Sequence, residues 1–166
     1  FYLDFYLNRD TVVDGCGQLS LPSASKLWFT PDGHWKEPGG YHNYPVSKLI
    51  EAALMLENNG YQIFNQYPIL LNASYVMLKY SFPDLTASAF GDTGRPRQSM
   101  ECLESAILMA DKYQLPILPD LLNAAMILEQ AGQYDRSKSG LTGLLCYLPE
   151  LPKAKSVDNH LWNRSE

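Results

Sequence analysis

The sequence predicts an all-α protein made of antiparallel helical hairpins. Apolar residues recur at the three- and four-residue spacing of a helix face in several segments after residue 45. Proline stands near the start of some of these segments and glycine stands just after the end of two of them. Helices of a few turns that are joined by short loops pack side by side as antiparallel neighbours.

The first well-marked helix is predicted over residues 46 to 60. Pro45 suits a first turn, where its missing N–H is not needed, and Gly60 stands where a helix commonly ends. The residues that share the apolar face are Val46, Leu49, Ile50, Ala53 and Leu56.

Three further helices follow, with residues 91 to 97 as a loop before the third. The second is predicted over 64 to 80, and Pro68 should lie near its start or kink it. The third covers about 97 to 113. The fourth covers 119 to 132, with Pro119 in its first turn and Gly132 at its end.

The two ends of the chain are less well marked. A fifth helix is predicted over about 137 to 147, although Gly140 and Gly143 lower its helix propensity. Residues 1 to 30 are ambiguous, and FYLDFYL at their start fits either helix or strand. We expect residues 1–148 to form the helical domain and 149–166 to be a tail or linker. Because the chain starts with Phe1, we also expect it to be part of a longer protein.

The amino-acid composition argues against several classes of function. The chain has 166 residues, and its 46% hydrophobic content suffices for one core. The net charge of −5 argues against a general nucleic-acid binder, and no apolar run approaches the ~18 residues of a membrane helix. The three cysteines show no metal-ligand spacing, and we predict neither a metal nor a cofactor. The eleven tyrosines suit a wet, ligand-facing surface, and equally the boundary of a helical core.

The segment PDGHWKEPGGYHNYP, residues 31 to 45, is the main candidate site. Tyr41 follows two glycines just before a helix, so it either packs on the first turn or serves as a proton-transfer group. A phenol has a reference pKa of about 10, so a phenolate base near pH 7 needs about 4 kcal/mol of stabilisation. His42, His34 and Lys36 could supply part of it, and a neutral phenol could act as an acid without any shift. We therefore name Tyr41 and His42 as catalytic candidates.

Other residues of this segment are substrate-binding candidates, each with a structural alternative. Asn43 could donate a hydrogen bond to a substrate carboxylate or cap the helix. Glu37 could orient a sugar hydroxyl or favour a helix N-terminus. Trp35 could stack on a sugar or belong to the core, and His34 could bind substrate or be structural.

A second candidate lies in GDTGRPR, residues 91 to 97. Arg95 and Arg97 flank a proline in a glycine-rich turn before a helix, which is a favourable setting for an anion. The order of residues is not that of a nucleotide phosphate loop. A solvated loop is the alternative interpretation.

Two stretches together resemble a known family. FTPDGHWKEPGGYHNYPVSKLIEAALMLENNG is similar to the motif that leads into a helix in heparinase II/III-like polysaccharide lyases, and FPDLTASAFGDTGRPR resembles the Gly-Asp loop that follows it. The resemblance covers residues 29 to about 112. Pro38 stands where the family usually has glycine.

The resemblance implies part of an (α/α) toroid, here an incomplete barrel, and cleavage of uronic-acid polysaccharides by β-elimination. It matches Tyr41 to the proton-transfer residue and implies an acidic polysaccharide or oligosaccharide as partner. It also implies a bacterial protein in the periplasm or outside the cell. Further N-terminal helices, the carboxylate-neutralising residues and a C-terminal β-domain would lie outside this chain, so we expect the chain alone to have little or no lyase activity.

Two other functions remain open on the sequence. The chain could be a non-catalytic helical carbohydrate-binding module. It could also belong to a glycoside hydrolase of the (α/α) toroid type, which needs two carboxylates across a cleft. Glu37 and Asp92 are the only pair that we can nominate for that chemistry.

Overall fold

The computed structural model describes residues 4, 7–13, 16–37, 41–87, 102–134, 146 and 150–152. Within these residues the protein is mostly helical, as predicted, with one short β-hairpin in addition. The elements are β1 (Thr11–Val13), β2 (Cys16–Gln18), α2 (Leu21–Leu27), α3 (Asn43–Asn58), α4 (Ile63–Gln66), α5 (Ile69–Ala73), α6 (Val76–Lys79), α7 (Leu103–Lys112) and α8 (Leu118–Gln130).

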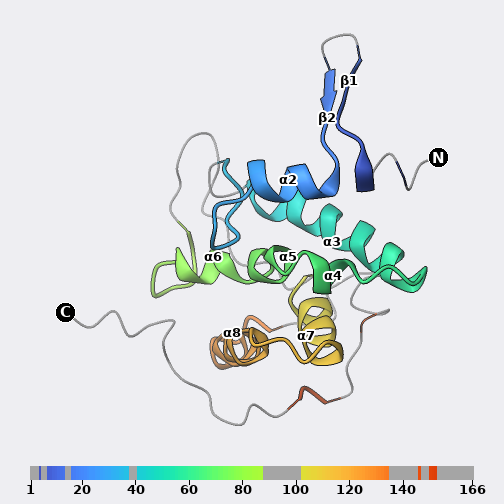
Figure 1. Ribbon diagram of the computed structural model, residues 1–166. Helices are drawn as coiled ribbons and strands as arrows, with labels where there is room; N and C mark the ends of the chain where they lie inside the picture. Colours follow the sequence, from blue (N-terminus) through green and yellow to red (C-terminus); the bar gives the residue numbers. More distant parts are fainter. Residues whose placement is uncertain are drawn as a thin grey trace.

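The helices lie in successive layers (Figure 1). The short helices α4, α5 and α6 follow one another in a row between α3 on one side and the α7–α8 pair on the other. Helix α3 packs on α4 and α5, α5 packs on α7, and α7 packs on α8. The β-hairpin projects from the helical body (Figure 1).

The N-terminal region that the sequence left ambiguous contains both kinds of structure. Asp4, Leu7 and Asn8 are helical, and β1 pairs antiparallel with β2. Helix α2 begins beside Asp10, whose carboxylate accepts hydrogen bonds from the Ser20 N–H at 2.7 Å and the Ser23 hydroxyl at 2.6 Å. Asp10 thus satisfies a donor at the start of the helix from outside the local sequence.

Helix α3 begins three residues before the predicted start, at Asn43 rather than Val46. Pro45 lies in its first turn, as expected, because the N–H that proline lacks has no partner there. At the other end Gly60 has φ +86° and receives the chain after the last helical turn, which confirms the predicted stop.

The predicted helix over 64 to 80 is wrong as a single element, because the segment folds as α4, α5 and α6. Pro68 cannot continue the helix from α4, and it stands directly before α5. The second break falls at Tyr75, which has φ −133° and ψ −4°. The Tyr75 ring is buried and its hydroxyl donates to Asp120 at 3.1 Å, so a tertiary contact is made where the helix is interrupted.

Helices α7 and α8 confirm the third and fourth predictions in outline. Helix α7 is described from Leu103, and the predicted start at 97 lies outside the described residues. Helix α8 has Pro119 in its first turn, and Gly132 follows its end with φ +65°. The fifth predicted helix and the tail lie almost entirely outside the described residues.

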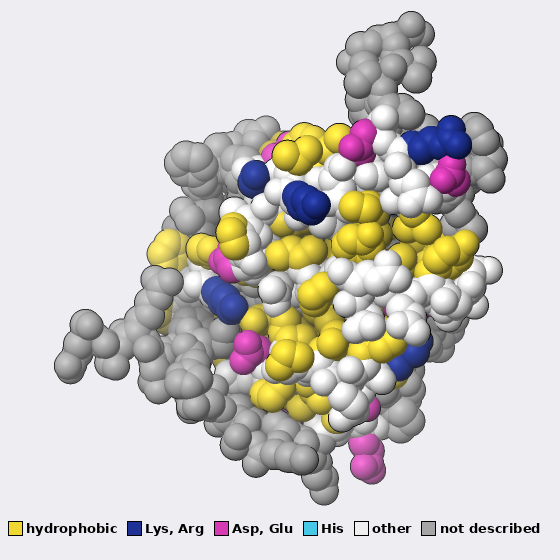
Figure 2. All heavy atoms as spheres, in the orientation of Figure 1, with side chains coloured by type: hydrophobic (Ala, Val, Ile, Leu, Met, Phe, Trp, Pro, Cys, Tyr) yellow, Lys and Arg dark blue, Asp and Glu magenta, His cyan; other side chains and the backbone are white. Residues whose placement is uncertain are grey.

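The core is one continuous apolar cluster between the layers. Its largest fully buried apolar side chains come from α3, α4, α5, α7 and α8 and from the residue before α6, and they are Tyr75, Phe64, Ile50, Ile63, Leu70, Leu71, Leu103, Ile107, Leu121 and Leu128. On the face shown in Figure 2, the acidic and basic side chains that are coloured are interspersed and form no stripe of one sign. Among the described residues no helix is long and apolar enough to cross a bilayer.

Candidate functional site

The first part of the candidate site is a small hairpin between α2 and α3. Phe29 and Trp35 form an antiparallel bridge, and the Thr30 N–H donates to the His34 carbonyl at 2.8 Å. The Gly33 N–H closes the turn by donating to the Thr30 carbonyl at 2.9 Å. Gly33 has φ +94°, a conformation that side chains disfavour, which explains the glycine of the PDG sequence.

Gly33 also fits closely against α5. A Cβ atom at this position would lie 2.7 Å from both the Ala73 backbone nitrogen and the Asn72 Cβ. Real Cβ atoms do not approach other atoms so closely, so only glycine lets the turn rest on this helix. The hairpin is therefore docked on α5 through its backbone.

His42 joins this hairpin to α3 and α5. Its Nε2 lies 2.8 Å from the Ala73 carbonyl oxygen, and its Nδ1 lies 2.9 Å from the Trp35 backbone nitrogen. A carbonyl can only accept, so Nε2 carries the proton and donates, while Nδ1 accepts from the Trp35 N–H. Both ring nitrogens are thus used to hold three segments together.

The environment of His42 keeps its ring neutral. The side chain is 1% exposed, and burial is the main cause that lowers its pKa to about 4. The neighbouring His34 ring, 5.0 Å away between centroids, acts in the same direction. A ligand could reach this imidazole only if the surrounding segments moved.

Tyr41 is exposed, whereas its neighbour His42 is buried. The Tyr41 side chain is 45% exposed, and it stands two residues before the first residue of α3. His42, the residue before α3, is held inward by its bonds to Trp35 and Ala73, and its neighbour Tyr41 remains at the surface. Tyr44, in the first turn, is 72% exposed, whereas Asn43 is half-buried.

Trp35 is the centre of an aromatic group. Trp28 stacks on it with ring centroids 5.3 Å apart and an interplanar angle of 10°, and the buried Phe29 meets it edge-on at 5.4 Å. Its Nε1–H donates to the exposed Glu37 carboxylate at 2.7 Å. Trp28 is 41% exposed and Trp35 is half-buried, so Trp28 is the more accessible ring of this stack.

His34 contacts Tyr80, and Tyr80 in turn contacts Asp32. The sequence did not mark Asp32 or Tyr80 as a candidate site residue. The Tyr80 ring meets His34 edge-on at 5.0 Å, and its hydroxyl donates to Asp32 at 2.5 Å. Thr30 donates to the other Asp32 oxygen at 2.5 Å. Asp32 and Tyr80 are 48 residues apart, and no local pattern joins them.

The hydrogen bonds from Thr30 and Tyr80, in that order, hold the pKa of Asp32 below its usual range. Asp32 is therefore a carboxylate at neutral pH. It is half-buried, and Tyr80 is 49% exposed, so the pair lies at the surface.

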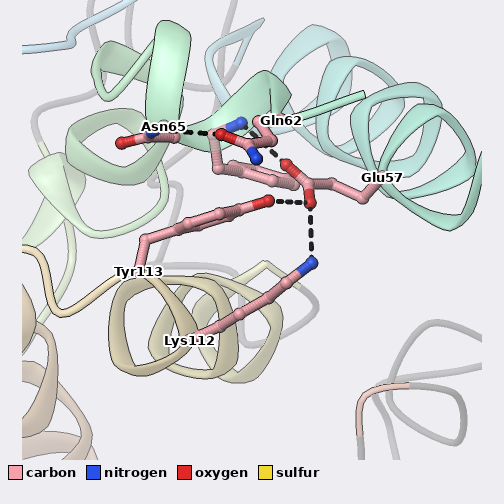
Figure 3. A network of polar contacts seen from close by, with 6 residues as sticks. Glu57, Gln62, Asn65, Lys112 and Tyr113 are labelled. Atoms are coloured by element: carbon pink, nitrogen blue, oxygen red, sulfur yellow. Dashed lines mark hydrogen bonds and ion pairs between the residues drawn. The ribbon is translucent and has the colours of Figure 1, made fainter. Parts of the chain in front are cut away.

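A second polar cluster lies at the other end of α3 (Figure 3). The buried Glu57 carboxylate accepts from the Phe64 N–H at 3.1 Å, from Lys112 at 3.0 Å and from the Tyr113 hydroxyl at 2.5 Å. Hydrogen bonding to Glu57 raises the pKa of Lys112. Because its contacts join α3, α4 and the end of α7, we interpret this cluster as a structural tie.

Arg95, Arg97 and Asp92 lie outside the described residues. No group of three or more potential metal ligands occurs within the part of the chain that the structure describes.

The fold and this geometry define a mostly helical protein that presents an aromatic and polar surface site at the start of α3. Neither family models, nor curated proteins, nor solved structures gave a match to the chain. A function must therefore be argued from the residues of the site.

Proposed function

We propose that the chain is the helical segment of a polysaccharide lyase that cleaves uronic-acid polysaccharides by β-elimination, with its helices forming part of an (α/α) toroid. The observation that carries the proposal is the pairing of an exposed Tyr41 with a buried His42 whose two ring nitrogens are both bonded. A surface phenol next to such an anchor starts from a fixed backbone position, which proton transfer requires.

In this reaction the C5–H bond of the uronate breaks first, and its electron pair delocalises into the uronate carboxylate. That pair then forms the C4–C5 double bond as the C4–O bond breaks. Tyr41 carries out the proton transfer: as phenolate it removes the C5 proton, and as phenol it can protonate the departing oxygen. Charge develops on the uronate carboxylate in the enolate-like intermediate, and stabilising that charge is a large part of the catalysis. The carboxylate-neutralising groups belong to the segments outside this chain.

We assign the other candidates different roles in this proposal. His42 acts as a positioning residue for Tyr41, because its ring nitrogens are already bonded to Trp35 and Ala73. Glu37 is exposed and bonded to Trp35, so it can orient a sugar hydroxyl beside the aromatic stack. Arg95 and Arg97 bind the acidic substrate, and Asn43 donates to it from the first turn of α3.

The proposal also covers the rest of the parent chain and the location of the protein. The parent chain carries further helices and a β-domain, acts on an acidic polysaccharide in the periplasm or outside a bacterial cell, and uses no cofactor. The 166-residue chain alone has little or no activity, because it lacks the groups that neutralise the uronate.

The test is Tyr41→Phe in the natural full-length chain that carries this segment. Turnover of heparin, heparan, alginate and chondroitin is followed by the ultraviolet absorbance of the unsaturated uronate. We expect the variant to lose turnover by at least about a hundredfold while retaining substrate binding, since general acid–base groups contribute about that much or more. Tyr44→Phe is the matched control, and it should keep near-wild-type turnover.

Unchanged turnover in Tyr41→Phe would show that Tyr41 does not carry out the proton transfer. Robust lyase activity of the 166-residue chain would contradict the proposal that part of the site lies elsewhere. Sugar binding without turnover in the full-length chain would instead identify a carbohydrate-binding module.

A further inference from the structure

The outward face of α3 carries the two most exposed large apolar side chains among the described residues, Tyr44 at 72% and Met55 at 67%. Between them stand Lys48 and Glu51, whose side chains are 57% and 35% exposed. The spacing of the four residues along the chain is four, three and four, which places them in one line along the helix surface. We call these four residues the α3 stripe.

The α3 stripe lies opposite the face of α3 that builds the core. Val46, Ile50 and Ala53 are buried in the apolar cluster, and the helical repeat places them on the other side of the helix from the stripe. Helices α4 and α5 pack on α3 (Figure 1). The core of the fold therefore does not use the stripe, and Tyr44 and Met55 remain in solvent.

The stripe is symmetric about its own centre. Tyr44 stands four residues before Lys48, and Met55 stands four residues after Glu51. If two copies of α3 pack antiparallel across a two-fold axis at this centre, each Lys48 faces the Glu51 of the second copy. Each Tyr44 then faces the Met55 of the second copy. The stripe is thus self-complementary, as a two-fold interface between identical chains requires.

The charges also select the direction of the second helix. Lys48 contacts Glu51 of its own helix at 2.9 Å, so the antiparallel pair of helices forms a ring of four charges with alternating signs. A carboxylate oxygen can accept more than one hydrogen bond, so Glu51 can bind a second ammonium group and keep the first. A parallel second helix in the same register would instead place each charge against its own kind, which is unfavourable.

The ends of the stripe supply the apolar part of the contact. The thioether of Met55 and the ring of Tyr44 form a sulfur–aromatic pair of the kind that is favourable in proteins. Their burial removes apolar surface from water at both ends of the helix pair. The polar centre fixes the register, and the apolar ends add affinity.

We propose that the α3 stripe is the contact surface of a homodimer in which two copies of the chain pack their α3 helices antiparallel. A single helix face buries less than the about 800 Å² per partner of a standard interface, so we expect a weak dimer with a dissociation constant on the order of 100 µM. The pairing does not involve Tyr41 and does not rest on the proposed function.

The experiment is sedimentation equilibrium of the 166-residue chain at concentrations from about 10 µM to about 1 mM, which span the expected dissociation constant. The wild type should change from monomer to dimer over this range. Lys48→Glu makes the centre of the stripe wholly acidic, and Glu51→Lys makes it wholly basic. Each variant alone opposes like charges in the dimer, so its association should weaken at least about tenfold.

A mixture of the two charge variants gives the decisive measurement. In a heterodimer of Lys48→Glu with Glu51→Lys, every acidic position faces a basic position of the other chain. We therefore expect the equimolar mixture to form a heterodimer with an affinity within about threefold of the wild type. A change that acts only within one helix cannot be reversed by mixing two chains.

Matched controls make the same changes elsewhere on the surface. Lys26→Glu, in α2, and Glu129→Lys, in α8, alter the net charge equally at exposed positions, and both should dimerise like the wild type. The double variant Tyr44→Ala/Met55→Ala should weaken association at least about tenfold, whereas Leu27→Ala at another exposed apolar side chain should not. Circular dichroism checks folding. If a charge variant does not fold, these alanine variants decide the question.

A wild type that stays monomeric at about 1 mM would overturn the proposal, and it would leave the stripe to another helix of the parent chain. Single charge variants that dimerise like the wild type, or a mixture that stays monomeric, would overturn it as well. These outcomes are distinct from a failure of the lyase proposal, which appears as a full-length chain without turnover.

Discussion

His42 and Ala73, which are 31 residues apart, are joined by a buried hydrogen bond of 2.8 Å between the imidazole Nε2 and a main-chain carbonyl. The same ring accepts the Trp35 N–H at 2.9 Å. One side chain thus fixes the hairpin, the start of α3 and the end of α5 relative to one another. The position of Tyr41 depends on this arrangement.

Replacing His42 should destabilise the whole fold. His42→Ala leaves the Ala73 carbonyl and the Trp35 N–H without their partner, and each lost buried bond costs about 1–3 kcal/mol. We expect a loss of about 2–6 kcal/mol in the free energy of unfolding, measured by urea denaturation. His34→Ala, at the half-buried neighbour, should cost clearly less. Equal losses in the two variants would contradict the anchoring role.

Stability should fall as the pH is lowered from 7 to 4. The folded pKa of His42 is about 4 and the ordinary value is 6.5, so the unfolded state binds more protons between these values. The free energy of unfolding therefore decreases through that window, by about 3 kcal/mol from His42 alone. The lowered pKa of Asp32 adds a loss only below about pH 4.

His42→Gln tests the origin of this pH dependence, because glutamine can also donate and accept but does not titrate. Urea denaturation at several pH values should give a much flatter profile between pH 7 and 4 than in the wild type. A variant that loses stability as steeply as the wild type would assign the effect to other groups.

Gly33→Ala should be far more damaging than Gly60→Ala. Both glycines have positive φ, at +94° and +86°, so both substitutions carry a strain of about 1 kcal/mol. Only at Gly33 would the new Cβ also meet α5 at 2.7 Å, whereas nothing lies within 4 Å at Gly60. We expect a difference of about 2 kcal/mol or more in the free energy of unfolding. A difference within error would show that the hairpin can move away from α5 at little cost.

Tyr113→Phe should destabilise the protein by about 1–2 kcal/mol. The change removes only the hydroxyl that donates to the buried Glu57 at 2.5 Å, a bond to a charged group. Tyr61→Phe makes the same chemical change at a partly exposed side chain, and its effect should stay within about 0.5 kcal/mol. Chemical denaturation of both variants checks the expectation, and similar values would mean that Lys112 and the Phe64 N–H satisfy Glu57 without Tyr113.

The sequence predicts well the ends of those helices that are followed by a glycine with positive φ. Gly60 and Gly132 mark the ends of α3 and α8 because positive φ is a local property of the backbone. The row α4–α6 was predicted as one helix because its side chains are apolar on nearly every side, which hides the break at Tyr75. That break accompanies a contact with Asp120, which periodicity cannot foresee.

In the candidate site, too, local features could be predicted from the sequence, whereas tertiary contacts could not. The glycine-rich turn before a helix pointed to Tyr41, whose exposure agrees with presentation at a surface. Sequence could not tell which of Tyr41 and His42 is buried, since the burial of His42 accompanies its tertiary bonds to Trp35 and to Ala73, 31 residues away. The pairing of Asp32 with Tyr80 spans 48 residues and emerges only when α6 is folded beside the hairpin.

The partners of His42 are both main-chain groups, and this has a consequence for mutational tolerance. Every residue type has a carbonyl, and every type except proline has an N–H, so substitutions at positions 35 and 73 leave the two bonds chemically available. At position 73 the cost comes from packing, and at position 35 it comes from packing and from the lost hydrogen bond between the Trp35 Nε1–H and Glu37. In a saturation library, position 42 should therefore accept very few residues, while position 35 should reject proline most strongly and accept other large apolar side chains.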